Sequence, residues 1–138
     1  MSRPEHTKAA LRIWGDDLVP SEISRLLGAP PTTSERKGDN LTGERSRYKG
    51  IAKTGGWRLV AAVNHEGDLE AQIKDIFSQL SFDLSVWREI GRNNQIDVFC
   101  GVFMKTGNDG LVFDASTLQM LGERGARLDL DIYGSNNS

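Results

Sequence analysis

The chain has 138 residues, a formal net charge of −2 at pH 7 and a single cysteine. This length is enough for one continuous hydrophobic core, and a lone cysteine excludes an intramolecular disulfide. The slightly acidic balance argues against general attraction to nucleic acid or anionic membranes, and no apolar run approaches the roughly 20 residues that span a bilayer. We therefore expect a soluble, cytoplasmic protein with one globular domain over residues 1–138, in which residues 1–6 and 135–138 form flexible ends.

The first third of the chain predicts a strand, a helix and a loop. Residues 8–14 alternate apolar and polar side chains, as a half-buried strand does. Residues 20–27 begin with proline and carry an apolar stripe at helical spacing, so we expect a short helix that ends at Gly28. Residues 39–56 contain several glycines and more basic than acidic side chains. They predict a long loop, which is uncommon inside a compact domain and typical of functional segments.

The middle of the chain predicts two strands around two helices. Residues 57–63 alternate as a strand with one apolar side, and residues 68–80 form the longest predicted helix, with Asp68 as its cap. Residues 84–90 fit either a short helix or a strand, and we favour a helical turn. Residues 96–104 predict a buried strand that carries apolar side chains on both faces.

The last third repeats the organisation of the first. A short helix is predicted after its cap at Asp114 and ends at Gly122 or Gly125, and residues 127–133 predict a final strand. The helix end Leu26-Leu27-Gly28 recurs as Met120-Leu121-Gly122, which suggests two related β-α-β units. Because each strand has one apolar side and each helix one apolar stripe, we expect an α+β fold: a mixed, mostly antiparallel sheet with helices packed on one face. The predicted core consists of Leu11, Ile13, Ile23, Leu27, Leu59, Ile73, Phe77, Val98, Cys100, Leu121, Leu130 and Ile132.

Several of these stretches together resemble one known family. They are G-D-D-L-V-P-S-E-I-S-R-L-L-G-A-P-P-T at residues 15–32, R-K-G-D at residues 36–39, G-G-W-R-L at residues 55–59, the V-F-C strand at residues 98–100 and the closing L-D-L-D-I-Y at residues 128–133. In order and spacing the chain resembles the bacterial domain-of-unknown-function family 4279 (DUF4279) over nearly its whole length. The resemblance implies a small α+β domain with no assigned activity and no catalytic residues to carry over. Some small bacterial families of this kind are immunity proteins against secreted toxins, which is an analogy of setting alone.

Four aspartates form a candidate metal site. Asp16 and Asp17 follow the first strand and Asp129 and Asp131 share one face of the last, so the four carboxylates would approach one another if those strands are neighbours. The favoured alternative is that the last two pair with arginines across strands, because no further histidine or glutamate completes a ligand set. We expect no cofactor, since the sequence has no nucleotide-binding glycine loop. Nucleophilic catalysis also lacks a sequence signature, because neither histidine has a serine or cysteine at a recognisable spacing.

The more informative candidate is the second face of the sheet. By alternation it gathers aromatic and charged side chains that point away from the helices, and an apolar patch of this size needs a cover. Three covers are open: the loop over residues 39–56 as a lid, a second copy of the protein, or a ligand or protein partner. Exposed phenylalanines also resemble a base-stacking platform, but the acidic balance and the missing RNA-recognition pattern argue against nucleic acid. The predicted members of this face are Arg12, Trp14, Arg58, Val60, Phe99, Phe103, Asp129, Asp131 and Tyr133.

These observations favour a non-catalytic binding or protein-interaction module, of which an immunity-like protein is one form. Trp, Tyr and Arg are the residue types that anchor protein interfaces. The expected partner is another protein or a second copy in a dimer, and neither nucleic acid nor a membrane. The alternative function is a metal-dependent enzyme that uses the four aspartates. The residues expected to bind the partner are Arg12, Trp14, Arg58, Phe99, Phe103 and Tyr133 of the sheet and Arg45 and Arg47 of the long loop.

Overall fold

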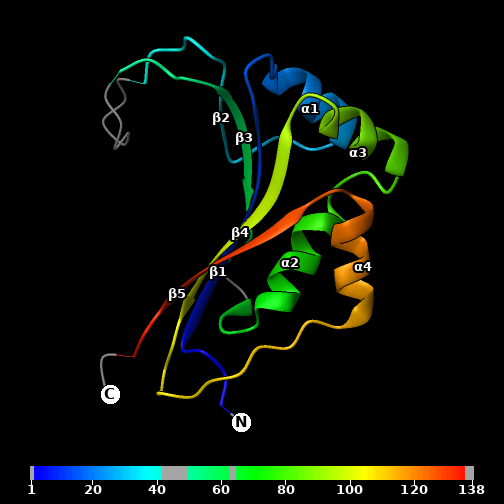
Figure 1. The fold of residues 1–138 in the computed structure, drawn as a ribbon. Helices are drawn as coiled ribbons and strands as arrows, with labels where there is room; N and C mark the ends of the chain where they lie inside the picture. The colour runs from blue at the N-terminus through cyan, green and yellow to red at the C-terminus, as the bar shows by residue number, and fades with distance from the viewer. Residues whose placement is uncertain (1, 42–49, 63–64, 136–138) are drawn as a thin grey trace.

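The structure, a computed structural model, describes residues 2–41, 50–62 and 65–135. None of the helices in these residues combines the length and the apolar character that crossing a bilayer requires. Figure 1 shows the arrangement of the elements. In chain order they are β1 (His6–Gly15), α1 (Pro20–Leu27), β2 (Thr33–Glu35), β3 (Gly55–Val60), α2 (Leu69–Ser78), α3 (Leu84–Gly91), β4 (Gln95–Phe103), α4 (Ala115–Glu123) and β5 (Arg127–Tyr133).

The five strands form one sheet in the order β2-β3-β1-β4-β5. β1 pairs antiparallel with both β3 and β4, and β2 pairs antiparallel with β3. Only β4 and β5 run parallel to each other among these neighbours. The predicted α+β fold with a mixed, mostly antiparallel sheet is therefore confirmed, and so is the helical turn favoured for residues 84–90, which lies in α3.

The two suggested β-α-β units are built differently. β4, α4 and β5 form a direct unit, because the two strands are adjacent and parallel. β1 and β2 also run parallel, since each is antiparallel to β3, but β3 lies between them. This order places β1 at the centre of the sheet and β5 at its edge, with β4 between them. The first and last strands are therefore not neighbours, contrary to the arrangement that the four-aspartate metal site requires.

One face of the sheet carries the core and the helices. Along β1 the side chains of Thr7, Ala9, Leu11 and Ile13 are buried, while the alternate residues are more exposed. All four helices of the described residues lie on the side to which these side chains point (Figure 1). This is the arrangement that a sheet with one apolar face and helices with one apolar stripe must adopt to remove that surface from water.

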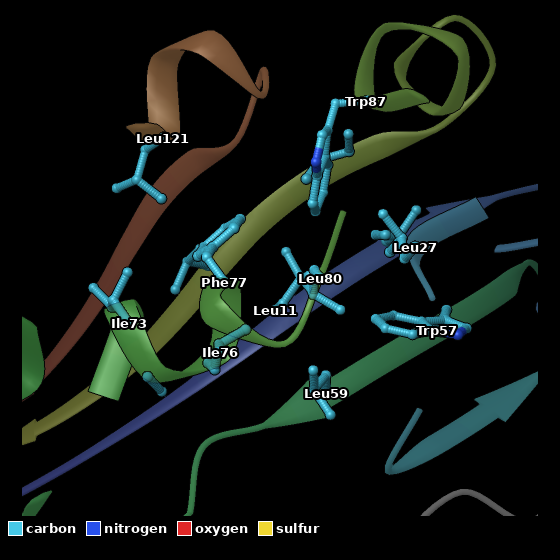
Figure 2. Packing of buried hydrophobic residues seen from close by; sticks show 14 of the residues in the cluster. Leu11, Leu27, Trp57, Leu59, Ile73, Ile76, Phe77, Leu80, Trp87 and Leu121 are labelled. Carbon is cyan, nitrogen blue, oxygen red and sulfur yellow. The ribbon is translucent and has the colours of Figure 1, made fainter. Parts of the chain in front are cut away.

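Two buried tryptophans connect the helices to the sheet and to each other (Figure 2). Trp57 of β3 donates a hydrogen bond from Nε1 to the Ser24 hydroxyl of α1 at 3.0 Å. Trp87 of α3 donates from Nε1 to the backbone oxygen of Ser81 at 2.9 Å, and its ring lies 5.6 Å from the ring of Phe77 in α2. Each indole thus fills the core while its only polar group is satisfied, as a buried tryptophan needs.

The prediction that Leu130 and Ile132 belong to the core is wrong. Leu130 is 38% exposed and Ile132 is 56% exposed, although both point to the helical side of the sheet. The physical reason is that β5 is an edge strand whose second half extends past the helices (Figure 1), so only Leu128 near its start packs against the core. The other ten predicted core residues are buried.

β3 begins earlier than its side-chain alternation predicts. Gly55 and Gly56, assigned to the long loop from sequence, are the first two residues of the strand. A Cβ atom at Gly55 would lie 2.9 Å from the backbone oxygens of Gly15 and Leu18, so only glycine fits this close approach. The chain before them also pairs: the Ala52 N–H donates to the Asp39 carbonyl at 2.8 Å, which continues the ladder between β2 and β3.

Pairing also begins early at the N-terminus, within the range predicted as a flexible end. β1 starts at His6, and the Glu5 N–H donates to the Phe103 carbonyl at 3.0 Å. Pro4 is buried, and Ser2 forms an isolated bridge with Asp109. The first described residues are therefore attached to the sheet and to the loop after β4.

Of the two predicted N-terminal helix caps, one forms as expected and the other does not. Asp68 accepts a hydrogen bond from the Ala71 N–H at 3.1 Å and caps α2 as predicted. Asp114 makes no side-chain cap bond at the start of α4. Instead the backbone N–H of Asp114 donates to the carboxylate of Glu70 on α2. A side chain of α2 thus accepts a hydrogen bond from the residue that precedes α4. That hydrogen bond lowers the pKa of Glu70 below its ordinary value.

Replacing Phe77 by alanine tests the core. The ring is 1% exposed and lies among the residues that join α2 to the sheet (Figure 2). Phe77→Ala removes this contact and leaves a cavity, so we expect the free energy of unfolding to fall by about 3–5 kcal/mol in urea titration. Phe82→Ala is the matched control, because Phe82 is 73% exposed and should cost little. Equal losses for the two variants would contradict the assigned core.

A second test uses the carboxylate that caps α4. Because the pKa of Glu70 is lowered in the folded protein, its charge stabilises the fold above the pKa of the unfolded chain, and this stabilisation is lost as pH falls through the lowered value. Glu70→Gln should therefore be less stable than the native protein at neutral pH, and the difference should shrink as the pH falls below the ordinary titration range of glutamate. Urea titrations across this range measure it. A difference that does not change with pH would show that charge on Glu70 contributes nothing.

Candidate functional site

The sheet face opposite the helices carries the predicted binding side chains of the strands. The registers of β1, β3, β4 and β5 place Arg12, Trp14, Arg58, Phe99, Phe103 and Tyr133 on this face, as the alternation predicts. Arg45 and Arg47 lie outside the described residues. We call this surface the open face, and define it by the side chains of His6, Lys8, Arg12, Trp14, Thr33, Glu35, Arg58, Val60, Gln95, Asp97, Phe99, Phe103, Arg127, Asp129, Asp131 and Tyr133.

At the centre of the open face Arg12 of β1 holds Asp97 of β4 with two hydrogen bonds. Arg12 and Asp97 are direct partners in the register, and Nε and Nη2 donate to the two carboxylate oxygens at 2.8 and 2.6 Å. Asp97 is fully buried, so its charge depends on this cation. Arg12 also lies 3.6 Å from the carboxylate of Asp129, and Arg127 lies 3.8 Å from that of Asp97. The hydrogen bonds to Asp97 raise the pKa of Arg12 above its ordinary value.

Two aromatic rings flank this ion pair. The guanidinium carbon of Arg12 lies 4.5 Å from the ring centre of Phe99 and 5.6 Å from that of Trp14. At these distances the ring faces attract the cation and shield it from water. The arginine is therefore fixed in position both by its charged partner and by the rings beside it.

A second ion pair lies toward the β2 edge. Arg58 of β3 contacts both carboxylate oxygens of Glu35 on β2, and its Nε donates to the Thr33 hydroxyl at 2.8 Å. The pair lies over Gly56, where a Cβ atom would come within 2.7 Å of Arg58 Nη1. The glycine that lengthens β3 thus also makes room for this ion pair.

The opposite end of the open face is aromatic. The rings of Phe103 and Tyr133 are stacked, with centres 4.7 Å apart and planes 8° from parallel. His6 belongs to the neighbouring strand β1, and the centre of its ring lies 5.1 Å from that of Phe103. The Lys8 amine, also on β1, lies 6.0 Å from the centre of the Phe103 ring. The Tyr133 hydroxyl donates to Asp131 at 2.7 Å. This end therefore offers a flat apolar surface bordered by polar groups.

Between the two arginines the open face has a hollow of about 200 Å³, lined by Arg12, Ile13, Trp14 and Arg58. Three of these four residues have a planar aromatic or guanidinium group in their side chain. Such a surface suits a partner side chain that has both flat and acidic character, because guanidinium groups bind carboxylates and stack on planar groups.

The four aspartates of the metal hypothesis lie apart. Asp16 is exposed at the end of β1 and pairs with Lys37 at 3.4 Å; Asp17 follows it. Asp129 of β5 is paired with Phe99 of β4, and Phe99 is paired with Ala10 of β1. The end of β1 at Gly15 is five residues beyond Ala10, which is about 16 Å along the strand. Among the described residues no three His, Cys, Asp or Glu side chains are close enough together to hold a metal ion. The contact between Asp129 and Arg12 is the cross-strand pairing that the sequence favoured.

The single thiol is also unsuited to catalysis. Cys100 is fully buried on the core side of β4. Burial, with smaller contributions from the charges of Asp97 and Asp129, raises the pKa of Cys100 to about 12. At neutral pH the side chain is a neutral thiol, whereas nucleophilic cysteines react as the thiolate.

Sequence reasoning missed the two carboxylates that hold the arginines, Asp97 and Glu35. Asp97 carried a usable signal: it is the one charged residue inside the apolar stretch over residues 96–104, and its parity places it on the same face as Phe99. A buried charge in a central strand needs a partner of opposite charge on an adjacent strand. Glu35 lies in a three-residue strand, which is too short for alternation to reveal.

Breaking the central ion pair should be costly. Arg12→Met leaves the buried carboxylate of Asp97 with only the more distant Arg127, so we expect a loss of about 3 kcal/mol in the free energy of unfolding. Asp129→Asn is the control, since Asp129 is half-exposed and should cost less than about 1 kcal/mol. The double variant Arg12→Met/Asp97→Leu should recover most of the stability. A double variant as unstable as the single one would show that the charge on Asp97 is not the cause.

The comparisons with other proteins give one positive result. The sequence model of one family, described as a domain of unknown function (DUF4279), matches residues 5–135. No curated protein and no solved structure matches the chain significantly. The matched range extends from Glu5, just before β1, to Ser135, just after β5, and therefore includes every strand of the sheet and every residue of the open face. The chain belongs to the DUF4279 family, as its motifs predict.

Proposed function

We propose that the protein is a non-catalytic protein-interaction module whose recognition surface is the open face. The observation that carries this proposal is a layer of arginine and aromatic side chains on the sheet face that the four helices leave uncovered (Figure 1). Among the described residues, Val60 and Tyr133 of this face are 49% and 48% exposed.

The chemistry of the face supports a protein partner. Tryptophan, tyrosine and arginine carry most of the binding energy in protein interfaces, and the open face presents all three types. Arg12 and Arg58 are each held by two contacts to a carboxylate. Because their rotamers are already fixed, a partner does not bear the full entropy cost of ordering these long side chains.

The charges of the face also indicate what the partner presents. Arg58 and Trp14 border the hollow, so an acidic or planar side chain is expected to enter there. The stacked pair of Phe103 and Tyr133 favours an apolar contact at the other end. An immunity-like role, in which the partner is a toxin, is one form of this function.

Photo-crosslinking tests the proposal directly. A benzophenone amino acid placed at Tyr133 or Trp14 in the full chain, expressed in its native cell, should crosslink to a partner protein, because both positions lie on the open face. The same probe at Phe82 is the control, since this exposed aromatic residue lies between α2 and α3 in the helical layer. Arg58→Gln should reduce the crosslinked product several-fold without unfolding the chain.

The outcome separates the possible occupants of the face. A crosslinked product with the mass of two chains, together with a dimer in size-exclusion chromatography that Phe103→Asp converts to a monomer, would assign the face to self-association. Equal crosslinking from Phe82 and from the open face, or none from either sheet position, would overturn the proposal.

A further inference from the structure

A second cleft lies in the helical layer, away from the hollow between Arg12 and Arg58. It has a volume of about 620 Å³ and is formed by the last turn of α3, the start of β4 and the end of α4. Its walls include Trp87 and Ile96, and three arginines line it: Arg88, Arg92 and Arg124. A volume of this size is within the range of sites for small organic molecules, roughly 300–1,000 Å³.

Arg124 is the unusual member of the cleft. Its side chain is almost completely buried, with the residue 7% exposed, yet its Nε has no hydrogen-bond partner in the described residues. Nη1 donates to the Met120 carbonyl at 3.2 Å, and the guanidinium carbon lies 5.9 Å from the ring of Phe77. An arginine is charged at all pH values that proteins meet, so a buried one normally has a carboxylate or another anion beside it.

Among the described residues Arg124 makes no ion pair, and Arg88 has only a long-range electrostatic interaction with Asp83. In the part of the chain that the structure describes, none of the nine ion pairs includes Arg88, Arg92 or Arg124. Arg88 and Arg92 are four residues apart at the end of α3, where such spacing places side chains on one helix face. Glu123 is the only acidic residue lining the cleft, and its carboxylate accepts a hydrogen bond from Gln119. The cleft is thus locally cationic in a chain of net charge −2.

A purely structural role accounts for part of this arrangement. Arg124 follows the last residue of α4, and its bond to the Met120 carbonyl satisfies one of the free acceptors at the helix end. That role uses one N–H group of the guanidinium. It explains neither the unpartnered Nε nor the two further arginines at the same cleft.

We propose that the cleft between α3 and α4 binds a small organic anion. Its phosphate or carboxylate group lies against Arg124, with Arg88 and Arg92 at the entrance, and its apolar part lies against Trp87 and Ile96. Guanidinium groups bind both kinds of anion through paired N–H donors, so the chemistry of the cleft fits either group. The inference is independent of the protein-interaction role, since Trp87, Arg88, Arg92 and Arg124 do not belong to the open face.

NMR titration with four probes tests the proposal. The probes are phenyl phosphate, benzoate, inorganic phosphate and the neutral benzyl alcohol. Phenyl phosphate or benzoate should produce saturable shifts in the Arg124 Nε–H, the Trp87 indole N–H and the amides of residues 122–125. Comparing these two decides between a phosphate and a carboxylate ligand, and inorganic phosphate shows what the anionic group contributes alone. Benzyl alcohol should leave the signals unchanged.

Variants of the exposed arginines avoid the risk of unfolding. Arg88→Gln/Arg92→Gln should weaken binding of the preferred probe by about tenfold or more while preserving the spectrum of the core. Arg25→Gln is the matched control, because it removes an exposed arginine near the end of a different helix, and it should leave affinity unchanged. Arg124→Lys keeps the charge but loses the paired donors, so it should also weaken binding.

Three results would overturn the proposal. They are an absence of saturable shifts with every anionic probe, equal shifts with benzyl alcohol, and unchanged affinity in the Arg88→Gln/Arg92→Gln variant. Any of these would leave Arg124 as a helix-capping residue alone, and none would bear on the open face.

Discussion

The buried charge of Asp97 is the constraint on which the sheet depends. A carboxylate without contact to water requires a cation beside it, and the register between β1 and β4 places Arg12 directly opposite. A slip of one residue would separate the two and would also turn Leu11 and Ile13 out of the core. The ion pair and the hydrophobic core therefore specify the same register from the two faces of one strand.

The two faces of the sheet are held together by different interactions. The helical side contributes stability through the indoles of Trp57 and Trp87 and the ring of Phe77, which are buried together (Figure 2). The open face contributes little apolar burial, and its arginines are held by charge and by ring faces. Arg12 belongs to the central strand β1, and its neighbours in the chain, Leu11 and Ile13, are buried in the core on the other face.

Much of the fold could be predicted from the sequence, since it follows from local periodicity. The alternation in β1 and the stripe of α2 assigned both elements and the face that each buries, and Asp68 was a correct cap. The failures concern information that local patterns do not contain. Leu130 and Ile132 have the parity of core residues, but strand order leaves them beyond the helices. Asp114 has the sequence of a cap, yet Glu70 of another helix supplies the acceptor.

The residues of the candidate site were likewise predicted only in part. Parity placed Trp14, Phe99 and Tyr133 on one face correctly, because it needs only the direction of each side chain. The single charge of Asp97 in an apolar stretch indicated a need for a partner, but which residue is that partner depends on which strands are adjacent. For the same reason the four aspartates were grouped on a neighbour relation that does not exist. The cleft around Arg124 joins the ends of two helices that are distant in sequence, and no spacing within either helix indicates it.

The central strand pair also bears on the order of events in folding. Arg12 and Asp97 are separated by 85 positions in the chain, so pairing β1 with β4 closes a long loop. The chain loses conformational entropy on this closure before contacts between the two strands can compensate for the loss. Sheets that depend on such distant pairings form more slowly than structures with local contacts. The helices and the hairpin of β2 and β3 can form from nearby residues. Until β1 and β4 meet, however, the two halves of the open face belong to separate segments, so the face exists only once this distant pairing has formed.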